Sequence, residues 1–382
     1  MVKLAIIGAS YLQEPLIRKA KEMGIETHVF AWKTGDAPGE KSADHFYPIS
    51  IVEKEEILAK CKEIGIDGIC TIASDLATVT VNHVANEMGL VGNSEECTSI
   101  STNKHLMRLA FEKNGDPSPR SVLVGSVEEA LKLELQYPVI VKPTDRSGSR
   151  GITKLKDPEG LADAVKAAMG ESFSKEALVE EFAEGIEYSV ESFSYQGKHD
   201  VITITRKYTT GSPHFIETGH IEPAKEINFT YEQIRKIVTH ALDSLKITNG
   251  ASHTELKISD EGVVRIIEIG GRMGGDFIGS DLVYLSTGVD FVRAVIDTAL
   301  GRKPDLSRGE KCNAAVRFIM NGQDAKLYDR VMGQDKDIVI ASEIDEDTEG
   351  VVTDSSNRHG YFIMRSDDRE LLESYLGDGE NG

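Results

Sequence analysis

Short apolar runs alternate with amphipathic segments over the N-terminal quarter of the chain, and this alternation constrains the fold more than any other feature. It predicts strands at 3–7, 26–32 and 66–72 and helices at 14–23, 52–64 and 76–88. Repeated strand–helix units of this kind form parallel, doubly wound sheets. Gly8 ends the first strand, but Ser10 and Gln13 occupy the second and third glycine positions of a dinucleotide-binding loop. We therefore expect a Rossmann-like half that lacks the nucleotide fingerprint.

The charge balance limits the partners of the chain. The formal net charge is −20, with 43 basic and 63 acidic residues among 382. Nucleic acids and anionic membranes both require dense lysine and arginine, so neither is expected as a main partner. A chain of this length should divide into about two or three domains, and its hydrophobic content is sufficient for substantial cores.

The cysteines and the N-terminal segment indicate a cytoplasmic protein. The four cysteines form no CxxC pair, which argues against a zinc site or a disulfide framework. They are Cys61, Cys70, Cys97 and Cys312. The apolar run before Gly8 is too short for a signal peptide, and no stretch approaches the roughly 18 apolar residues of a membrane span.

An acidic hairpin is predicted at 253–269, with a Ser-Asp-Glu-Gly turn between its two strands. If Ile258 pairs with Val263, side-chain alternation makes Glu255 and Glu268 diagonal neighbours on one face, about 7–8 Å apart at Cα. Two such carboxylates repel each other unless a cation lies between them, and oxygen ligands of this kind suit Mg²⁺. A solvated strand face is an equally good interpretation of these two residues alone.

A phosphate-binding loop is predicted after the strand at 138–143. Lys142 lies near the end of this strand, and the Gly/Ser-rich segment 144–151 follows with Arg146 and Arg150. Backbone N–H groups of such a loop can close over phosphates, and a lysine adds a point charge. The lysine precedes the loop, so the motif is not a P-loop. A mobile surface hairpin is the competing interpretation, but two arginines close together in an acidic chain favour an anion site.

The rest of the pattern gives an acid-rich strand at 177–182, which carries Glu180 and Glu181, and a further strand that begins at Glu187. Other predicted elements are helices at 102–113, 127–134, 160–169, 231–245 and 282–300 (interrupted at 286–288), a strand at 200–208, and a loop or edge strand at 214–220. A linker at 302–309 leads to a small β-rich tail with strands at 313–320, 337–343 and 361–365 and a helix at 367–375.

Four features occur in one order along the chain: a helix lysine, a strand-end lysine with its loop, an acidic strand, and two carboxylates before an arginine. This combination resembles the ATP-grasp superfamily and, within it, the carboxylate–amine ligase branch with bacterial L-amino acid ligases and carbamoyl-phosphate-synthase-like proteins. The resemblance implies a multidomain α/β and α+β fold. Its parts would be a Rossmann-like pre-ATP-grasp domain (1–98), a split ATP-grasp domain (99–308) with a mobile small lid subdomain (about 115–183), and a small β-rich α+β C-terminal domain (309–382).

The resemblance also implies the ATP contacts. The phosphates would be bound by Lys104 and Lys142 and covered by the loop residues Ser147, Gly148, Ser149 and Gly151. Backbone groups near Phe182 and Ala183 would read the adenine edge, a side chain of Glu180 or Glu181 its amino group, and Glu187 the ribose hydroxyls.

The chemistry is assigned by the same resemblance to four side chains. Glu255 and Glu268 would bind one or two Mg²⁺ ions, with Mn²⁺ as a substitute, while Lys142 and Arg272 face the transferring phosphoryl group. Many relatives carry Glu-x-Asn-x-Arg at this place. Gly270 replaces that asparagine here, which leaves the number of metal ions open.

The implied reaction joins a small carboxylic acid to an amine through an acylphosphate, with release of ADP and phosphate. The alternatives are a purine-pathway or carbamoyl-phosphate-type reaction and a non-catalytic nucleotide-binding regulator. Few basic residues in the N-terminal domain could bind a phosphorylated substrate, and the intact catalytic set argues against a regulator. Homodimers are common among such proteins. Four histidines have no assigned role: His214, His220, His253 and His359.

Overall fold

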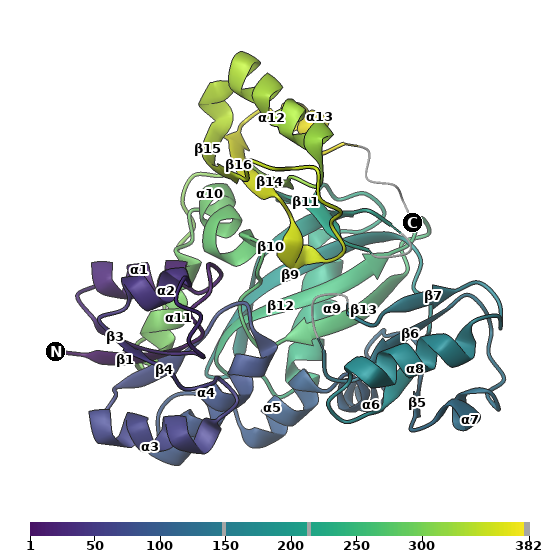
Figure 1. Cartoon of the computed structure of the whole chain (residues 1–382), viewed down its shortest axis with the longest axis horizontal. Helices are drawn as coiled ribbons and strands as arrows, with labels where there is room; N and C mark the ends of the chain where they lie inside the picture. Colours follow the sequence, from purple (N-terminus) through teal and green to yellow (C-terminus); the bar gives the residue numbers. More distant parts are fainter. Residues whose placement is uncertain (147–149, 212–214, 378–382) are drawn as a thin grey trace.

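The computed structural model describes residues 1–146, 150–211 and 215–377 and arranges them around three sheets (Figure 1). Ser147, Gly148, Ser149 and His214 lie outside the described residues. One sheet is parallel and the other two are antiparallel with helices packed on them, so the predicted multidomain α/β and α+β fold is confirmed.

The first sheet has the order β3-β2-β1-β4 and all its pairs are parallel. Its strands are β1 Lys3–Ile7, β2 Glu26–Phe30, β3 His45–Tyr47 and β4 Gly68–Cys70, and its helices are α1 Glu14–Glu22, α2 Pro38–Ser42, α3 Lys54–Ile64 and α4 Asp75–Met88. The apolar runs form these strands because both faces are covered by helices, and Leu4, Ile6 and Ile7 are fully buried. Among the elements of this first sheet, the sequence prediction missed only α2 and β3, which are too short to show a hydrophobic period.

The second sheet, of order β5-β8-β6-β7, forms a small lobe at the right of Figure 1. Its elements are β5 Ser121–Val124, α7 Val127–Ala130, β6 Val139–Pro143, β7 Thr153–Leu155, α8 Leu161–Glu171 and β8 Ala177–Glu181. Helix α8 buries Val165 and Ala168 in one cluster with Val141 and Val179 of the strands. This lobe carries Lys142 at the end of β6 and Glu180 on β8.

The third sheet has eight strands in the order β13-β12-β9-β10-β11-β14-β16-β15. The strands are β9 Ile186–Tyr195, β10 Lys198–Thr209, β11 Glu217–Glu222, β12 Gly250–Ile258, β13 Val264–Gly270, β14 Asn313–Phe318, β15 Val339–Ile344 and β16 Gly360–Ser366. The helices are α5 Glu95–Thr102, α6 Lys104–Asn114, α9 Tyr231–Ser244, α10 Val283–Thr287, α11 Phe291–Ala299, α12 Gly322–Gln334 and α13 Arg369–Leu376. The helix predicted at 102–113 is α6, which Lys104 opens, whereas α5 was not predicted.

Side-chain alternation on β9 and β12 gives this sheet one apolar and one polar face. Tyr188, Val190 and Leu256 pack in one cluster with residues of α6 and α9. The residues between them therefore point to the opposite face. This face carries Glu187, Glu191 and Glu255, so the acidic residues gather on the side of the sheet opposite α6 and α9.

Two expectations about the C-terminal half change. The segment at 214–220 was predicted as a loop or edge strand, which is wrong for β11, because this strand pairs with β10 on one side and β14 on the other. The predicted β-rich tail supplies β14, β15 and β16, and these strands extend the same sheet. Local sequence could not show this pairing, because β11 and β14 are far apart in the chain.

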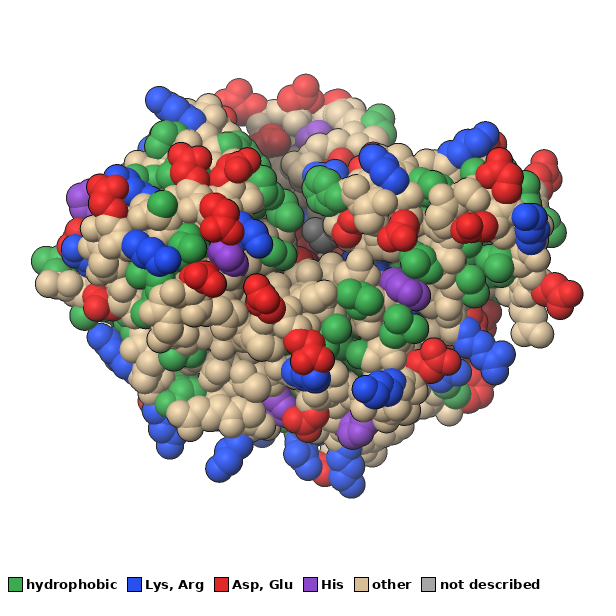
Figure 2. Space-filling model, turned by 90° about the horizontal axis from the view of Figure 1, so that it is seen from below, with side chains coloured by type: hydrophobic (Ala, Val, Ile, Leu, Met, Phe, Trp, Pro, Cys, Tyr) green, Lys and Arg blue, Asp and Glu red, His purple; other side chains and the backbone are tan. Residues whose placement is uncertain are grey.

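The surface carries side chains of both charges (Figure 2). On the face shown in Figure 2, acidic and basic side chains are interspersed, and the face is hollowed near its centre. No helix within the described ranges has both the length and the apolar character that crossing a bilayer requires.

Candidate functional site

The acidic hairpin forms, but its register differs from the prediction. Ile258 pairs with Val264, and a bulge lets Glu255 pair directly with Glu268. The predicted pairing of Ile258 with Val263 and the diagonal placement of the two glutamates are therefore wrong, because the pairing begins one residue later on β13 and Ile267 is an extra residue on that strand. Directly opposed residues lie closer than diagonal ones, with Cα atoms about 4.5–5.5 Å apart. The bulge thus brings the two carboxylates closer together than a regular ladder would.

Two buried lysines balance these carboxylates. The Lys104 Nζ atom lies 2.8 Å from a Glu268 oxygen, and the Lys207 Nζ atom lies 2.8 Å from a Glu255 oxygen. Lys207 also lies 2.9 Å from Glu187. Burial would lower the pKa of Lys207, but the surrounding carboxylates raise it well above its ordinary value. Burial would raise the pKa of Glu255, but Lys207 and His253 hold it well below its ordinary value, so both groups are charged.

Lys142 is held by a second buried cluster. Its Nζ atom lies 2.5 Å from a Glu180 oxygen, and the Arg108 guanidinium lies 2.8 Å from the other oxygen. Burial, reinforced by Arg108, lowers the pKa of Lys142 despite the attraction of Glu180. Arg108 also donates to the Ile267 carbonyl at the bulge, at 2.7 Å. Both Glu180 oxygens are therefore already paired within the protein. Glu181 on the same strand is exposed, so its side chain is the more available of the two to a ligand.

A single cavity of about 1110 Å³, open to solvent, brings the predicted site residues together. Its lining includes Lys104, Lys142, Glu180, Glu181, Phe182, Ala183, Glu187, Glu255, Glu268 and Arg272. Gly151 is described but does not line the cavity. Residues from the small lobe, from α6 and from the large sheet therefore meet around one space.

One end of this cavity is apolar. Ile140, Ile152 and Phe182 line it, and the Lys154 Nζ atom lies 3.6 Å from the centre of the Phe182 ring. The Phe182 N–H donates to the Pro138 carbonyl at 3.2 Å. No hydrogen bond joins the Ala183 N–H to another described residue, so this donor is the one available at the predicted adenine edge.

Arg272 forms a two-point ion pair with Asp75, which begins α4. Its Nε and Nη2 atoms donate to the two Asp75 oxygens at 2.9 and 2.8 Å. Burial would lower the pKa of Arg272, but Asp75 raises it. A Cβ atom at Gly270 would lie 2.8 Å from an Asp75 oxygen and 3.0 Å from the Arg272 guanidinium carbon. The ion pair therefore occupies the space into which a side chain at position 270 would extend.

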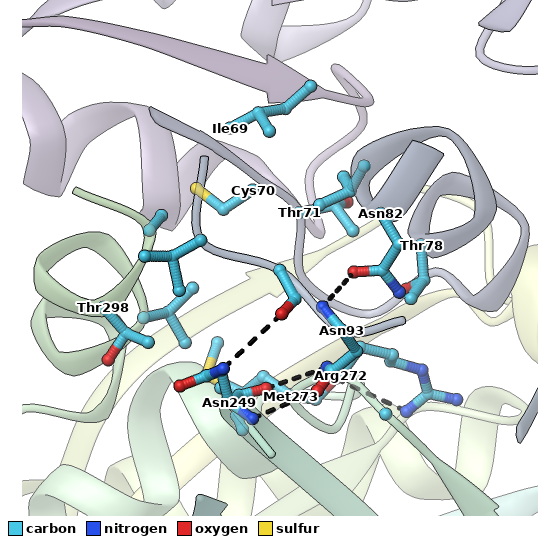
Figure 3. Close-up of a pocket in the computed structure, with 18 residues that line it drawn as sticks. Ile69, Cys70, Thr71, Thr78, Asn82, Asn93, Asn249, Arg272, Met273 and Thr298 are labelled. Atoms are coloured by element: carbon cyan, nitrogen blue, oxygen red, sulfur yellow. Dashed lines mark hydrogen bonds between the residues drawn. The ribbon is translucent and has the colours of Figure 1, made fainter. Parts of the chain in front are cut away.

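A smaller pocket lies behind Arg272, between the first sheet and the start of β12 (Figure 3). The Asn93 N–H donates to the Asn82 side chain at 3.0 Å, and the Asn93 side chain donates to the Asn249 carbonyl at 2.9 Å. The Ala73 N–H donates to the Met273 carbonyl at 3.1 Å. These bonds fix α4 and its Asp75 against the glycine-rich turn that carries Arg272.

A second cavity adjoins the first. Both are lined by Asp75, Glu217, His253, Glu255 and Arg272. The second cavity adds Ser10, Tyr11, Lys207, His220, Asp276 and Arg358. His359 lines neither cavity and bonds instead to the Gly350 carbonyl at 2.9 Å.

His253 lines both cavities and lies two residues before Glu255, on the same face of β12. Its Nδ1 atom lies 2.7 Å from the buried Glu191. Burial would lower the pKa of His253, but Glu191 and Glu255 raise it to about 9. Sequence reasoning missed Arg108, Glu191 and Arg358 and noted Lys207 only as a strand end. For Arg108 and Glu191, a charged residue inside a helix or strand was the available signal, whereas Arg358 lies outside both kinds of element and gave none.

Comparison with known proteins identifies the fold around this cavity. Residues 135–281 match the family model described as the ATP-grasp domain. The chain contains an ATP-grasp domain. The predicted resemblance is thus confirmed. Within curated proteins, an alanine–anticapsin ligase of Bacillus subtilis is 26% identical in an alignment of 306 residues that covers 70% of this chain. The chain covers 64% of that ligase's length.

Solved structures extend the likeness over nearly the whole chain. The L-amino acid ligase of Bacillus licheniformis has a TM-score of 0.82 at 23% identity, over 98% of this chain and 96% of that one. A phosphoribosylglycinamide synthetase from Anaerococcus prevotii has a TM-score of 0.77 at 24% identity, with the same two coverages of 98% and 96%. Because ligases with different substrates share this fold, the fold alone does not identify the substrates.

Proposed function

We propose that the protein is an ATP-dependent carboxylate–amine ligase that forms an amide bond through an acylphosphate. One observation carries the proposal: the cavity with the predicted ATP-binding residues shares five lining residues with a second polar cavity. A nucleotide in the first cavity would thus place its γ-phosphate beside a small molecule in the second. The L-amino acid ligase and the alanine–anticapsin ligase support the same reaction class.

The hairpin carboxylates fit Mg²⁺. Glu255 and Glu268 are opposed on one sheet face and supply only oxygen donors, which suits Mg²⁺ or Mn²⁺. Bound Mg²⁺ would neutralise phosphate charge during transfer. Lys104 and Lys207 now balance the two carboxylates and would have to share them with the ion. Gly270 offers no donor, so the two glutamates are the ligands we propose.

The chain's own residues would position the reactants and stabilise charge. Lys104 and Lys142 would bind phosphate oxygens, and Arg272 would face the phosphoryl group as it moves. The carboxylate of the acid substrate attacks the γ-phosphorus, the bond to the β-phosphate oxygen breaks, and ADP leaves. The amine then attacks the acyl carbon, and phosphate leaves. The sites of both steps must exclude water, because acylphosphates hydrolyse readily.

The second cavity is the proposed substrate site. Arg358 is held by Asp276 at 2.8 Å, and Arg272 by Asp75, so cations and carboxylates alternate along the wall. Cations would bind the substrate carboxylate, and carboxylates would bind an ammonium group. Such a lining favours small zwitterionic substrates, as amino acids are.

The test combines ATP and Mg²⁺ with a panel of small acids and with hydroxylamine as a common amine. Hydroxylamine converts an acylphosphate into a hydroxamate, which is measured beside ADP release. We expect both products to depend on the acid. Glu268→Gln should lower turnover by about 100-fold or more, because it removes charge needed in the transition state. Glu261→Gln, in the exposed turn of the same hairpin, should leave turnover unchanged.

Other outcomes would support the alternatives. ATP binding without ADP release for any acid and amine would favour a nucleotide-binding regulator. Turnover only with bicarbonate or with a phosphorylated amine would favour the carbamoyl-phosphate-type or purine-type reaction. Unchanged turnover in Glu268→Gln would refute the metal assignment.

A further inference from the structure

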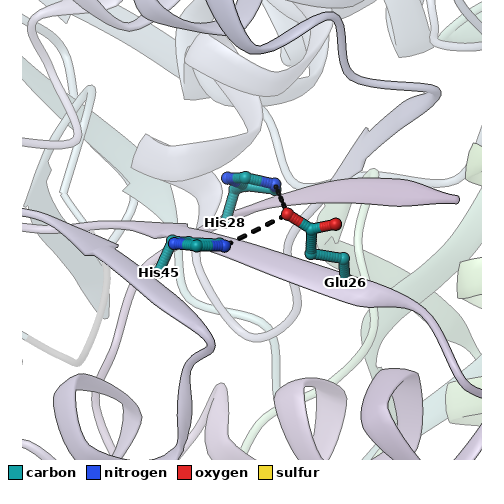
Figure 4. Close-up of side chains that lie close together, drawn as sticks. All are labelled: Glu26, His28 and His45. Carbon is teal, nitrogen blue, oxygen red and sulfur yellow. Dashed lines mark hydrogen bonds and ion pairs between the residues drawn. The ribbon is translucent and has the colours of Figure 1, made fainter. Parts of the chain in front are cut away.

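Two histidines and one glutamate converge on the first sheet, away from both cavities. His28 on β2 pairs with His45 on β3, and Glu26 lies two residues before His28 on the same strand face. Figure 4 shows the two rings stacked, with the Glu26 carboxylate directed at both. Glu26 also pairs with Lys3 at the start of β1, whereas the second cavity is reached by residues that follow the end of β1. The cluster is therefore separate from the proposed active site.

The distances within the cluster match those of a metal centre. One Glu26 oxygen lies 3.2 Å from the His28 Nε2 atom and 3.1 Å from the His45 Nε2 atom. In a tetrahedral zinc site with ordinary bond lengths, neighbouring ligand atoms lie about 3.4 Å apart. The three ligand atoms all lie within 4.8 Å of one another, and the ring centres are 4.7 Å apart. Small side-chain rotations would bring both nitrogens onto one ion.

The buried His28 has a nitrogen that lies near the Glu26 carboxylate but forms no hydrogen bond with it. His28 is 3% exposed, and its Nε2 atom has no partner of hydrogen-bond geometry among the described residues. A buried polar atom without a partner is costly. Its other nitrogen, Nδ1, lies 3.1 Å from the Tyr47 hydroxyl. In metal sites, a histidine that binds the metal through one ring nitrogen usually forms a hydrogen bond through the other. This hydrogen bond fixes the orientation and the tautomer of the ring.

From this arrangement we propose that Glu26, His28 and His45 form a binding site for a zinc-type divalent ion. Two imidazoles and one carboxylate select such ions over Mg²⁺, which prefers oxygen ligands. The side chain of His45 is 50% exposed and that of Glu26 is 24% exposed, so water can complete the coordination. The ion would join the short edge strand β3 to β2 and would thereby stabilise the edge of the first sheet.

The test titrates the purified protein with Zn²⁺ by calorimetry in excess Mg²⁺, which would occupy the hairpin carboxylates. We expect one Zn²⁺ per chain and a higher midpoint of thermal unfolding. Co²⁺ should give the intense visible absorption of a tetrahedral site. His45→Ala changes an exposed ligand, so it should fold normally and weaken Zn²⁺ binding by more than about 100-fold. Tyr47→Phe should weaken it by about 10-fold, as loss of an outer contact does.

Two controls make the result specific. His240 also pairs with a carboxylate, since its Nδ1 atom lies 2.7 Å from Asp116, but it has no second histidine beside it in the described structure. His240→Ala should therefore leave Zn²⁺ binding unchanged, and so should Glu268→Gln, which separates this site from the proposed active site. Absence of saturable Zn²⁺ binding, or equal binding by His45→Ala, would overturn the proposal.

Discussion

The residue type at position 270 is restricted by a neighbouring ion pair. One partner of this pair, Asp75, comes from another part of the chain. The Asp75–Arg272 pair occupies the space into which a side chain at position 270 would extend. Asp75 comes from α4 of the first sheet, so the glycine-rich turn depends on a partner about two hundred residues earlier in the chain. The glycine at position 270 thus has a physical cause in this protein.

This cause can be tested by Gly270→Ala. The added methyl group would push on the Asp75 carboxylate and the Arg272 guanidinium, which it would meet at 2.8 and 3.0 Å. We expect kcat/KM for ADP release to fall by up to about 100-fold, because small displacements of a catalytic group are costly. Overpacking should also lower the free energy of unfolding by about 1–3 kcal/mol.

Gly271→Ala is the matched control for this change. Its Cβ atom would meet nothing closer than the Ser101 hydroxyl at 3.7 Å, which is ordinary van der Waals contact. Kinetics and urea unfolding of both variants would check the prediction. Equal effects at the two positions would show that the ion pair does not require a glycine at 270.

At the scale of elements, the sequence indicated many of the longer strands and helices, although not α5 or α12, and it did not show how they meet. Side-chain alternation along β12 puts His253 and Glu255 on one face. This could be inferred from the sequence, because alternation depends only on the strand itself. The bulge at Ile267 depends on other elements: the Ile266 N–H donates to the Pro117 carbonyl, and Arg108 binds the Ile267 carbonyl. The direct opposition of Glu255 and Glu268 was therefore beyond local reasoning.

The contact between α9 and the segment after α6 should depend on pH. His240 on α9 pairs with Asp116, and this hydrogen bond, the main cause, raises the pKa of His240 above its ordinary value. The folded state thus binds the proton more tightly than the unfolded state. The stabilisation is complete below about pH 6.5, the ordinary value, and is lost as pH rises through the raised pKa. Because His240 is largely exposed, this contribution to the free energy of unfolding should be below about 1 kcal/mol.

A double-mutant cycle measures this contact. Urea unfolding of wild type, His240→Gln, Asp116→Asn and the double variant gives the coupling free energy at about pH 6 and about pH 9. We expect coupling at the lower pH and little at the higher one. A coupling that does not change with pH would contradict the assignment of the His240 charge.

At the scale of the whole molecule, the proposed site is assembled from parts far apart in sequence. Asp75 comes from the first sheet, Lys142 from the small lobe, and Arg358 from the segment that leads into β16. The sequence order of motifs predicted residues that do meet around the first cavity. It could not predict the second cavity, because the positions of Arg358 and Asp276 depend on how the C-terminal strands join the large sheet.

The C-terminal residues from 309 onward were expected to form a small domain of their own, and a truncation tests that boundary. β11 pairs with β14 through four residue pairs, and Ile221 packs in one cluster with Ala315, Phe362 and Leu372. A chain that ends at residue 308 would leave β11 as an unpaired edge and expose this apolar cluster. Exposed edges of this kind promote aggregation. We therefore expect the truncated chain to be insoluble or to lose cooperative thermal unfolding.

A chain that ends at residue 377 keeps every described residue and is the control, with stability and ADP release expected to equal those of the full chain. Arg358→Gln separates the two roles of the C-terminal segment. It keeps the strands but removes a cation from the second cavity, so it should raise KM for the acid or amine while ATP binding is retained. A soluble, cooperatively folded 1–308 chain would show that the C-terminal strands are a separate unit despite their place in the sheet.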